Sequence, residues 1–362
     1  MNNKSRKKII KTKHGDLKTP VFLPDATRGY VKLLGNDEVL KTGIQSMVVN
    51  TFHLYLQPGM RLIKKAGGIH NFMSWQGPLL SDSGGFQVFS LIRQKNKKTA
   101  LGSVSEKEVV FKSPLDGSCH KLTPEKSIQI QFDLGVDMMV CLDDCPPNDL
   151  EKEDMEKSVI RTIAWAKRCR KEYDRQIKKR KIKDSERPLL FSVIQGGVYL
   201  DLRRECAEEL VKIGFDGYGF GARPVDKNGN FLEEVLSYTA DLIPDDSLRF
   251  ALGIGMPEDV VCCARMGWDI FDCVIPTREG RHGRLFYLKN DSLKDNFYYT
   301  LNIINSKFQK DFSPINLNSE IKELREYSKA YLYHLFKTKD TLGQRLASLN
   351  NLEFYSNLMK KL

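Results

Sequence analysis

Four aspartates stand at the ends of short apolar runs, and their carboxylates could do acid–base or nucleophilic chemistry. Asp82, Asp143, Asp144 and Asp272 each lie where a run typical of a buried strand ends. Clustered carboxylates raise one another's pKa, so such a group usually serves metal binding, proton transfer or nucleophilic attack. A single aspartate at this position more often caps the next helix. No histidine accompanies these acids, which leaves an all-oxygen magnesium site as the metal alternative.

Glycines follow several of the same runs, where a missing side chain lets backbone N–H groups approach a planar or anionic ligand. Both a phosphate cradle and a purine slot fit this pattern. The runs do not match the Walker pattern of nucleotide triphosphate binding. The glycines are Gly84, Gly85, Gly196, Gly197, Gly217, Gly219 and Gly221.

Eight apolar runs bounded by turns or helix caps are expected to form strands, and helical stretches separate most of them. This alternation predicts an α/β fold, a closed TIM (β/α)8 barrel. Active sites of such barrels lie at the carboxyl ends of the strands, so the four aspartates are expected at one mouth. The runs are Pro20–Leu23, Ser46–Asn50, Pro78–Ser81, Asp137–Leu142, Leu189–Gln195, Phe215–Gly221, Phe250–Gly255 and Asp269–Ile275. The expected helices include Asp37–Thr42, Arg61–Ala66, Lys152–Ile182, Asp201–Ile213, Asn230–Ile243 and Pro257–Met266.

The expected catalytic barrel spans residues 14–295, with an insert at about 92–135 between the third and fourth strands. Within this insert Val109–Ser113 and Cys119–Leu122 flank a turn and predict a hairpin. Thr123 and Pro124 then start a helix as N-cap and first helical residue. Residues 296–362 lack the alternation and are expected to form a helical C-terminal subdomain.

The composition predicts a soluble globular protein of the cytoplasm. Of the 362 residues 41% are hydrophobic and 28% are charged, and no apolar run approaches the roughly 20 residues of a membrane span. The basic amino terminus has no apolar segment behind it and does not read as a secretion signal. Eight cysteines without C-x-x-C spacing favour free thiols.

The net charge of +11 is concentrated in two segments. Residues 1–13 carry six lysines and arginines, and residues 161–183 carry eleven against two acids. Concentrated basic charge suits a polyanion, because lysine and arginine release counterions from phosphates. The alternative for each segment is a solvated helix face or a loose tail.

Several blocks together resemble the signature of tRNA-guanine transglycosylases, also called queuine tRNA-ribosyltransferases, of the bacterial kind. They occur in family order between about residues 14 and 355, and as a set they are highly specific. The blocks are Asn50–Leu54, Gly67–Trp75, Ser81–Leu91, Gln195–Gly197, Gly214–Tyr218 and Phe271–Arg278.

The resemblance implies a TIM barrel that exchanges guanine in tRNA, at the anticodon wobble position, for a 7-deazaguanine such as preQ1 or queuine. It implies that Asp272 is the nucleophile, forming a covalent ribosyl ester, and that Asp82 is the general acid and base. This agrees with the chemistry of retaining glycosidases, in which one carboxylate attacks the anomeric carbon and a second group handles the proton.

The resemblance also implies which residues bind the substrates. Asp143, Gln195 and the backbone amides near Gly221 and Ala222 would read the purine edge, and Phe86 and Leu252 would sandwich the base. Thr277, Arg278 and Arg281 would bind tRNA beside the reacting nucleotide. The expected partners are tRNA and the deazaguanine base, a homodimer is compatible with the resemblance, and no membrane partner is expected.

Two departures from the family pattern are visible. The positions of its three zinc-binding cysteines and one histidine hold Ser319, Ile321, Leu324 and Asn350 here, so no zinc and no other cofactor is expected. After the sixth strand Arg223 and Lys227 replace an apolar residue and an acid, which leaves the choice of deazaguanine open, with Arg223 expected to point away from the ligand.

Two other functions remain as alternatives. One is a noncatalytic tRNA-binding subunit that pairs with an active relative. The other is a related base-exchange enzyme acting on DNA.

Overall fold

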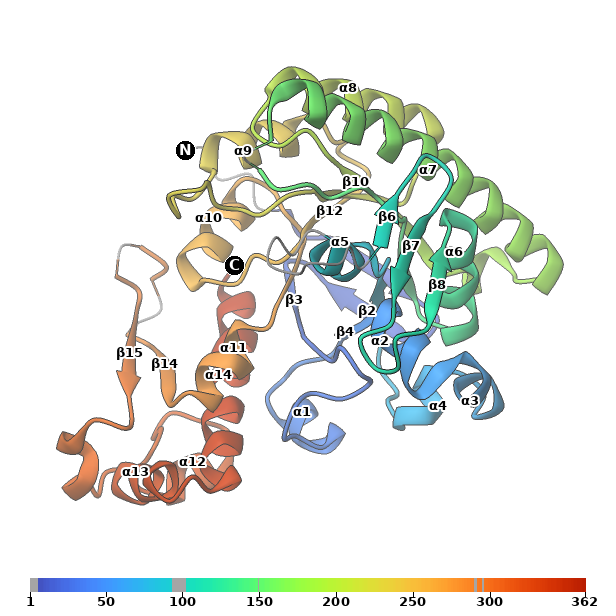
Figure 1. The fold of residues 1–362 in the computed structure, drawn as a ribbon. Coiled ribbons are helices and arrows are strands. Elements are labelled where there is room, and N and C mark those ends of the chain that lie inside the picture. The colour runs from blue at the N-terminus through green and yellow to red at the C-terminus, as the bar shows by residue number, and fades with distance from the viewer. Residues whose placement is uncertain (1–5, 93–101, 149, 290–291, 295) are drawn as a thin grey trace.

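Eight parallel strands form a closed barrel in the computed structural model, which describes residues 6–92, 102–148, 150–289, 292–294 and 296–362 (Figure 1). Around the barrel the order is β3, β13, β12, β11, β10, β9, β5, β4. A parallel bridge between Asp25 and Val48 joins β3 to β4, with the Ala26 N–H 2.8 Å from the Val48 oxygen. The strands are β3 (Val21–Pro24), β4 (Met47–Asn50), β5 (Leu79–Asp82), β9 (Met138–Val140), β10 (Leu189–Ile194), β11 (Gly217–Phe220), β12 (Leu248–Ala251) and β13 (Ile270–Cys273). The predicted TIM barrel is confirmed.

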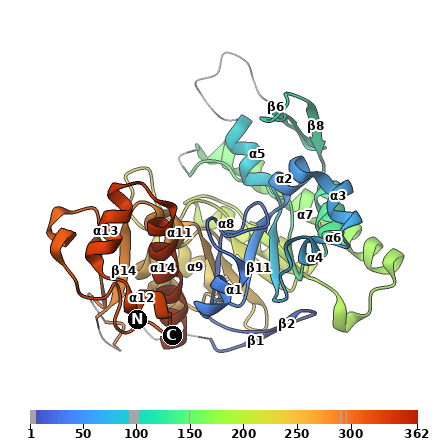
Figure 2. The same ribbon diagram turned by 90° about the horizontal axis from the view of Figure 1, so that it is seen from below.

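An antiparallel hairpin of β1 (Ile9–Thr12) and β2 (Gly15–Lys18) closes the amino end of the barrel. Ile10 and Leu17 are buried in one apolar cluster with side chains that fill the barrel, such as Leu80, Met138 and Phe250. Figure 2 shows the hairpin at one end of the barrel and the insert at the other. The sequence had predicted only a basic tail here.

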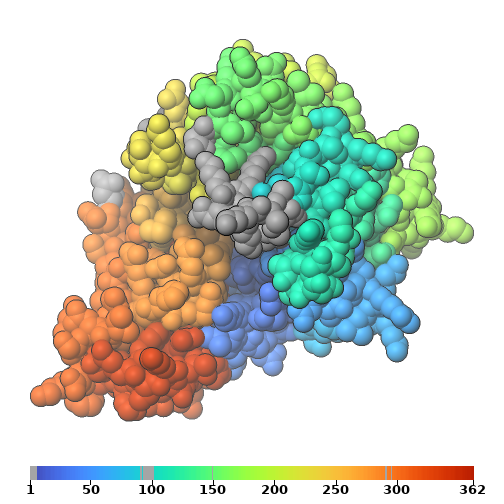
Figure 3. Space-filling model, in the orientation of Figure 1, coloured from blue at the N-terminus to red at the C-terminus, as the bar shows by residue number. Residues whose placement is uncertain are grey.

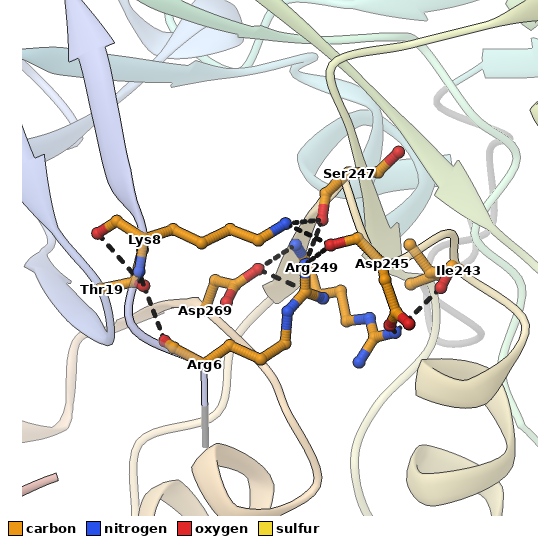
Figure 4. Close-up of polar contacts among 8 residues, drawn as sticks. All are labelled: Arg6, Lys8, Thr19, Ile243, Asp245, Ser247, Arg249 and Asp269. Atoms are coloured by element: carbon orange, nitrogen blue, oxygen red, sulfur yellow. Dashed lines mark hydrogen bonds and ion pairs between the residues drawn. The ribbon is translucent and has the colours of Figure 1, made fainter. Parts of the chain in front are cut away.

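Basic residues before this hairpin bind the amino end of the barrel (Figure 4). Arg6 donates to the backbone oxygens of Asp245 and Ser247 at 2.6 and 2.7 Å, and it lies 3.7 Å from the carboxylate of Asp269. Lys8 donates to the same two oxygens at 2.5 and 3.2 Å. Arg6 and Lys8 therefore hold the barrel together at the end opposite the aspartates, and this arrangement does not support a phosphate-binding role for them.

Helices surround the barrel, and the six expected from sequence are present as α1, α3, α7, α8, α9 and α10. The sequence analysis did not predict α2, α4 or α5, which are short, or α11, which directly follows Asp272. The helices of the barrel region are α1 (Asn36–Lys41), α2 (Thr51–Leu54), the irregular turn η1 (Tyr55–Gly59), α3 (Met60–Lys65), α4 (Ile69–Met73), α5 (Gly85–Ile92), α6 (Pro124–Leu134), α7 (Lys152–Arg180), η2 (Asp184–Glu186), α8 (Leu200–Ile213), α9 (Glu233–Asp241), α10 (Pro257–Arg265) and α11 (Ile275–Arg281).

The insert between β5 and β9 contains a three-stranded antiparallel sheet in which β7 lies in the middle. Its strands are β6 (Gly102–Val104), β7 (Val109–Lys112) and β8 (Cys119–Leu122). The predicted hairpin is confirmed as β7 and β8. Thr123 caps α6 by accepting from the Lys126 N–H at 3.1 Å, as its sequence predicts.

The chain after α11 forms a hairpin and a set of helices beside the barrel. In Figure 3 this region lies on the opposite side of the molecule from the insert. Its longest helix, α14, contacts α11, β14 and β3, so it covers the barrel wall next to Asp272. The elements are β14 (Arg284–Leu288), β15 (Tyr298–Asn302), η3 (Ser306–Lys310), α12 (Lys322–Glu326), α13 (Lys329–Lys337) and α14 (Thr341–Lys361). Within the described residues, every helix is too short or too polar to cross a bilayer.

Candidate active site

Asp82 is the last residue of β5 and is held by hydrogen bonds from three directions. Its Oδ1 accepts from the backbone N–H groups of Thr51 and Gly84, both at 3.1 Å, and its Oδ2 accepts from the side chain of Asn50. Gln87 on α5 lies 3.4 Å from Oδ2. Burial raises the pKa of Asp82 to about 7, although the backbone hydrogen bonds oppose the shift. This carboxyl can therefore gain or lose a proton near neutral pH.

Asp272 on β13 lies at the same end of the barrel. The Gly253 N–H donates to its Oδ1 at 2.9 Å. Burial raises the pKa of Asp272 to about 6, and its charge contributes to the higher pKa of Asp82. Of the two carboxyls Asp272 thus ionises more readily and Asp82 keeps its proton more readily, a combination that suits one nucleophile and one acid.

A further carboxylate at this mouth, Asp25, was not singled out from the sequence. It directly follows β3, which lies between β13 and β4, and its Oδ1 accepts from the Thr27 N–H at 3.2 Å. Its charge raises the pKa values of both Asp82 and Asp272. The rule that selected the other aspartates, an acid directly after an apolar run, would have found it.

Asp144, by contrast, belongs to the wall of the barrel and not to this group. Its carboxylate pairs with Arg161 on α7, and its backbone oxygen accepts from the Ser158 hydroxyl at 2.7 Å. The expectation that all four aspartates share one mouth is therefore wrong for Asp144, which anchors the start of α7. Asp143, the residue before it, instead accepts a hydrogen bond from Gln195 at the end of β10.

Asp143 and Gln195 form a buried pair at the ends of β9 and β10. The Gln195 Nε2 donates to Asp143 Oδ2 at 2.7 Å, while the Gln195 Oε1 is buried without a partner among the described residues. Burial raises the pKa of Asp143 to about 6 in spite of the Gln195 hydrogen bond. A buried carboxylate beside an unsatisfied amide oxygen presents acceptors, which suit a ligand edge that carries N–H donors.

The end of β11 places a backbone donor beside this pair. The Gly221 N–H donates to the Ile194 oxygen at 2.9 Å, so it is already used. The next N–H, that of Ala222, has no partner among the described residues, and Ala222 has a φ of +132°, which L residues rarely adopt. Of the two predicted amides, Ala222 is thus the one available to a ligand.

The two apolar residues expected to sandwich a base are placed by α5 and by the segment after β12. Phe86 is 51% exposed although it is aromatic, and it lies four residues after Asp82. Leu252 is half-buried, with its side chain against Gly219. An exposed phenylalanine next to acid groups is typical of a surface that stacks on a planar ligand.

The three residues expected to bind tRNA all lie on α11, directly after Asp272, but they differ in exposure. Thr277 is 2% exposed and its hydroxyl lies 3.3 Å from the Val274 oxygen, so its side chain is buried against the start of its own helix. Arg278 is exposed and Arg281 is half-buried. Arg281 lies near Asp25, whose charge opposes the lowering of its pKa by burial. The two arginines therefore flank the carboxylate mouth.

Ion pairs neutralise part of the basic surplus of residues 161–183, which lies elsewhere on the molecule. Arg168 pairs with Glu125 at 2.7 Å, Arg175 with Glu172 at 2.6 Å and Arg180 with Asp133 at 2.5 Å. The end of α7 meets the end of α6, and barrel helices run antiparallel to the strands, so these last residues lie at the amino end of the barrel. Part of this surplus is thus structural, while five lysines of the segment form no ion pair among the described residues: Lys171, Lys178, Lys179, Lys181 and Lys183.

Arg223 and Lys227 both lie in the loop after β11. Both side chains are exposed, and Asp226 closes a tight turn by accepting from the Asn228 and Asn230 N–H groups at 2.8 Å. Asn148 holds this loop by donating to the Arg223 oxygen at 2.8 Å. The side-chain amide of Asn148, which lies between β9 and α7, therefore supports the loop.

The four positions at which the family resemblance places zinc ligands do not fit a metal. Ile321 and Leu324 are buried hydrocarbons. The Ser319 hydroxyl donates to Glu353 Oε2 at 2.5 Å, and Asn350 donates to the Phe286 oxygen at 3.0 Å. A buried polar network and apolar packing occupy the place of a metal centre.

One other group of residues offers three metal-binding atoms close together, at the amino end of the barrel. It consists of His14, His70 and Asp137. The two imidazoles are stacked with centroids 3.7 Å apart, and Asp137 accepts from His14 Nδ1 at 2.8 Å and from the Leu79 N–H at 2.9 Å. Parallel rings do not aim both nitrogens at one ion, so these contacts describe a hydrogen-bonded support for β5 and β9.

The carboxyl end of the barrel thus carries two buried carboxyls, Asp82 and Asp272, the hydrogen-bonded pair of Asp143 and Gln195, and two arginines on α11, a combination that suits glycosyl transfer. Comparison with known proteins specifies the class. The profile of the family described as "Queuine tRNA-ribosyltransferase" matches residues 2–362. The chain is 41% identical over its full length to "Queuine tRNA-ribosyltransferase" of Halothermothrix orenii, covering 90% of that protein, and 41% identical to that of Caldanaerobacter subterraneus, with 99% and 89% covered. It is 38% identical to the protein of that name from Psychrobacter, with 99% and 88% covered. The chain belongs to the queuine tRNA-ribosyltransferase family, and it is a pentosyltransferase.

Proposed function

We propose that this enzyme exchanges guanine in tRNA, at the wobble position of the anticodon, for a 7-deazaguanine base such as preQ1 or queuine. The observation that carries the proposal is the pair of Asp82 and Asp272 at one mouth, with pKa values raised to about 7 and about 6. The names of the relatives and the base-reading pair of Asp143 and Gln195 support the same substrate class.

In the first half-reaction an oxygen of Asp272 attacks C1′ of the target ribose. The C1′–N9 bond breaks, its electron pair goes to the leaving guanine, and protonated Asp82 gives that base a proton. The Gly253 N–H at 2.9 Å holds Oδ1 of Asp272, so Oδ2 is the attacking oxygen. The ribosyl ester keeps the energy of the glycosidic bond, so no ATP is required.

In the second half-reaction Asp82, now ionised, takes the proton from N9 of the incoming base. That nitrogen attacks C1′, the ester bond breaks, and Asp272 leaves as a carboxylate. Two displacements at the same carbon give retention of configuration, as in retaining glycosidases. Each group returns to its first state, and the polynucleotide strand is never cut.

The base is read along one edge and held between two apolar faces. Asp143 accepts from the purine N1–H and exocyclic amine, while the Ala222 N–H and the second N–H of Gln195 Nε2 donate to the purine oxygen. Phe86 and Leu252 lie above and below the ring. Arg278 and Arg281 bind the phosphates beside the target nucleotide, which places tRNA on the face formed by α11.

The C-terminal subdomain is proposed to fold without zinc. Ser319, Ile321, Leu324 and Asn350 offer no thiolate or imidazole, and Glu353 supplies hydrogen bonds in the same place.

The direct test is incorporation of radiolabelled guanine into a tRNA transcript and into a DNA of the same sequence. We expect incorporation into the tRNA alone, and its replacement when preQ1 or queuine is added. Labelling of DNA alone would establish the related exchange on DNA. Binding of tRNA without any labelling would establish the noncatalytic subunit.

A further inference from the structure

Arg203 on α8 is a fully buried cation directly behind the base-reading groups, and its exposure is 0%. Within the described residues it forms no ion pair. Burial lowers the pKa of Arg203 to about 9, so it remains charged at neutral pH. Burying a guanidinium without a carboxylate is costly, and its donors must be satisfied in another way.

Three backbone oxygens satisfy it, and all three come from the segments that frame the base site. Nε donates to the Gly197 oxygen at 2.7 Å, Nη1 to the Ile194 oxygen at 3.3 Å and Nη2 to the Gly221 oxygen at 2.9 Å. The guanidinium also stacks over the Phe220 ring, 4.1 Å from its centroid. Arg203 thus connects the end of β10 to the end of β11. Gln195 lies in the sequence between Ile194 and Gly197, whose oxygens accept two of these hydrogen bonds.

The contact with the Gly221 oxygen fixes the direction of the next N–H. The C=O of Gly221 and the N–H of Ala222 belong to one peptide group, and in a trans peptide they point in opposite directions. Because Arg203 holds the oxygen, the Ala222 N–H points away from Arg203. Gln195 lies close to this peptide, since its Nε2 is 2.5 Å from where a Cβ on Gly221 would be.

The chain beside Arg203 has room for glycine but not for a side chain. A Cβ on Gly196 would lie 2.7 Å from Cγ of Arg203. Ala222 has an unfavourable φ of +132°, and Arg203 holds the peptide that precedes it. The Ala222 N–H has no partner among the described residues.

We propose that Arg203 is a positioning residue that aims the Ala222 N–H at the purine oxygen and strengthens this donor as negative charge develops on the departing base. A cation on the carbonyl end of a peptide polarises its N–H, and a preorganised donor costs no reorganisation during reaction. The inference rests on the proposed base exchange and adds a residue that does not touch the base itself.

The test measures inhibition of exchange by three bases: guanine, 2-aminopurine, which lacks the oxygen and the N1–H, and hypoxanthine, which lacks only the exocyclic amine. In Arg203→Lys and Arg203→Met we expect the preference for guanine over 2-aminopurine to fall roughly three- to tenfold, the range of one neutral hydrogen bond. The preference over hypoxanthine, which depends on Asp143, should stay within twofold. The matched control is Arg204→Lys, the exposed neighbour on α8, which should retain both preferences.

Equally weakened inhibition by all three bases, or an unchanged preference for guanine over 2-aminopurine, would overturn the inference. Either result would leave the proposed exchange activity intact. Failure of the wild-type enzyme to bind guanine would overturn the proposed function as well. If neither Arg203 variant folds, a crystal structure of the wild-type enzyme with guanine decides. It should show the Ala222 nitrogen about 2.9 Å from the purine oxygen with Arg203 still on Gly221, and an oxygen that is bound without Ala222 would refute the inference.

Discussion

Asn50 and Asp82 are register partners on the neighbouring strands β4 and β5, and the Asn50 amide donates to the Asp82 carboxylate. The same amide accepts from the His53 N–H at 3.0 Å through its oxygen, so its orientation is fixed. A proton-transferring carboxyl must stay in place in both protonation states. Asn50 therefore positions the carboxyl that we propose moves the proton, while burial keeps the pKa of Asp82 near neutrality.

The first prediction concerns pH. Formation of the covalent adduct needs ionised Asp272 and protonated Asp82, whose pKa values are about 6 and about 7. Its rate should peak between these values and fall about tenfold per unit below and above them. Because the two groups interact, the apparent values belong to the pair. Single-turnover formation of the adduct between pH 5 and 9 measures this.

Release of the adduct by an incoming base should behave differently, because it needs ionised Asp82. Its rate should rise with pH and level off above about 7. Equal pH profiles for the two half-reactions would contradict the role of Asp82 as both acid and base. Asp82→Asn should lose both steps.

The second prediction concerns Asp25. Removal of its negative charge should lower the pKa values of Asp82 and Asp272, so Asp25→Asn should move both limbs of the adduct-formation profile to lower pH. The matched control is Asp16→Asn, an exposed acid on β2 at the other end of the barrel, which should leave the profile in place. A profile that does not move in Asp25→Asn would separate Asp25 from the pair.

The third prediction concerns tRNA. Arg278→Gln and Arg281→Gln should each weaken tRNA binding and reduce the slope of log affinity against log salt by about 0.7, the value for one phosphate contact on a single strand. Lys178 and Lys179 end α7 at the amino end of the barrel, so a double substitution to glutamine should leave the slope unchanged. The reverse result would place the tRNA on the α7 face.

The fourth prediction concerns the C-terminal subdomain. A strong chelator should change neither thermal unfolding nor exchange, and elemental analysis should find no stoichiometric zinc. Glu353→Ala should instead destabilise the protein by about 1–3 kcal/mol, since the buried Ser319 hydroxyl and the Glu320 N–H lose their acceptor. The exposed neighbour Glu320→Ala is the control. Unfolding by the chelator would show that other residues bind a metal.

The barrel was predictable because its strands are buried on both faces and therefore read as continuous apolar runs. Val48, Leu80 and Phe250 fill the barrel interior, while neighbours such as Val49 and Ala251 pack outward against the helices. The residues on both faces of these strands are therefore apolar. The carboxyl-end rule then placed Asp82, Asp143 and Asp272 together without knowledge of any distance.

Other features depend on contacts that no local pattern records. Asp143 and Asp144 are adjacent and chemically identical, so the sequence does not distinguish them. The ion pair of Asp144 with Arg161, 17 residues away, identifies Asp144 as the residue in the barrel wall. Arg6 reads as part of a basic tail until its partners at positions 245 and 247 are known. Arg203 lies in a charged helix pattern, and its burial follows from three backbone oxygens on two strands.

Mass analysis of the protein after denaturation with tRNA tests the account's central claim most directly. Wild-type enzyme incubated with tRNA without a competing base should carry a ribosyl-linked tRNA fragment on the peptide that contains Asp272, and free guanine should be released in equal amount. Asp272→Asn should bind tRNA within a few fold of wild type and form no such linkage. A linkage on any other residue, or one that persists in Asp272→Asn, would contradict the account.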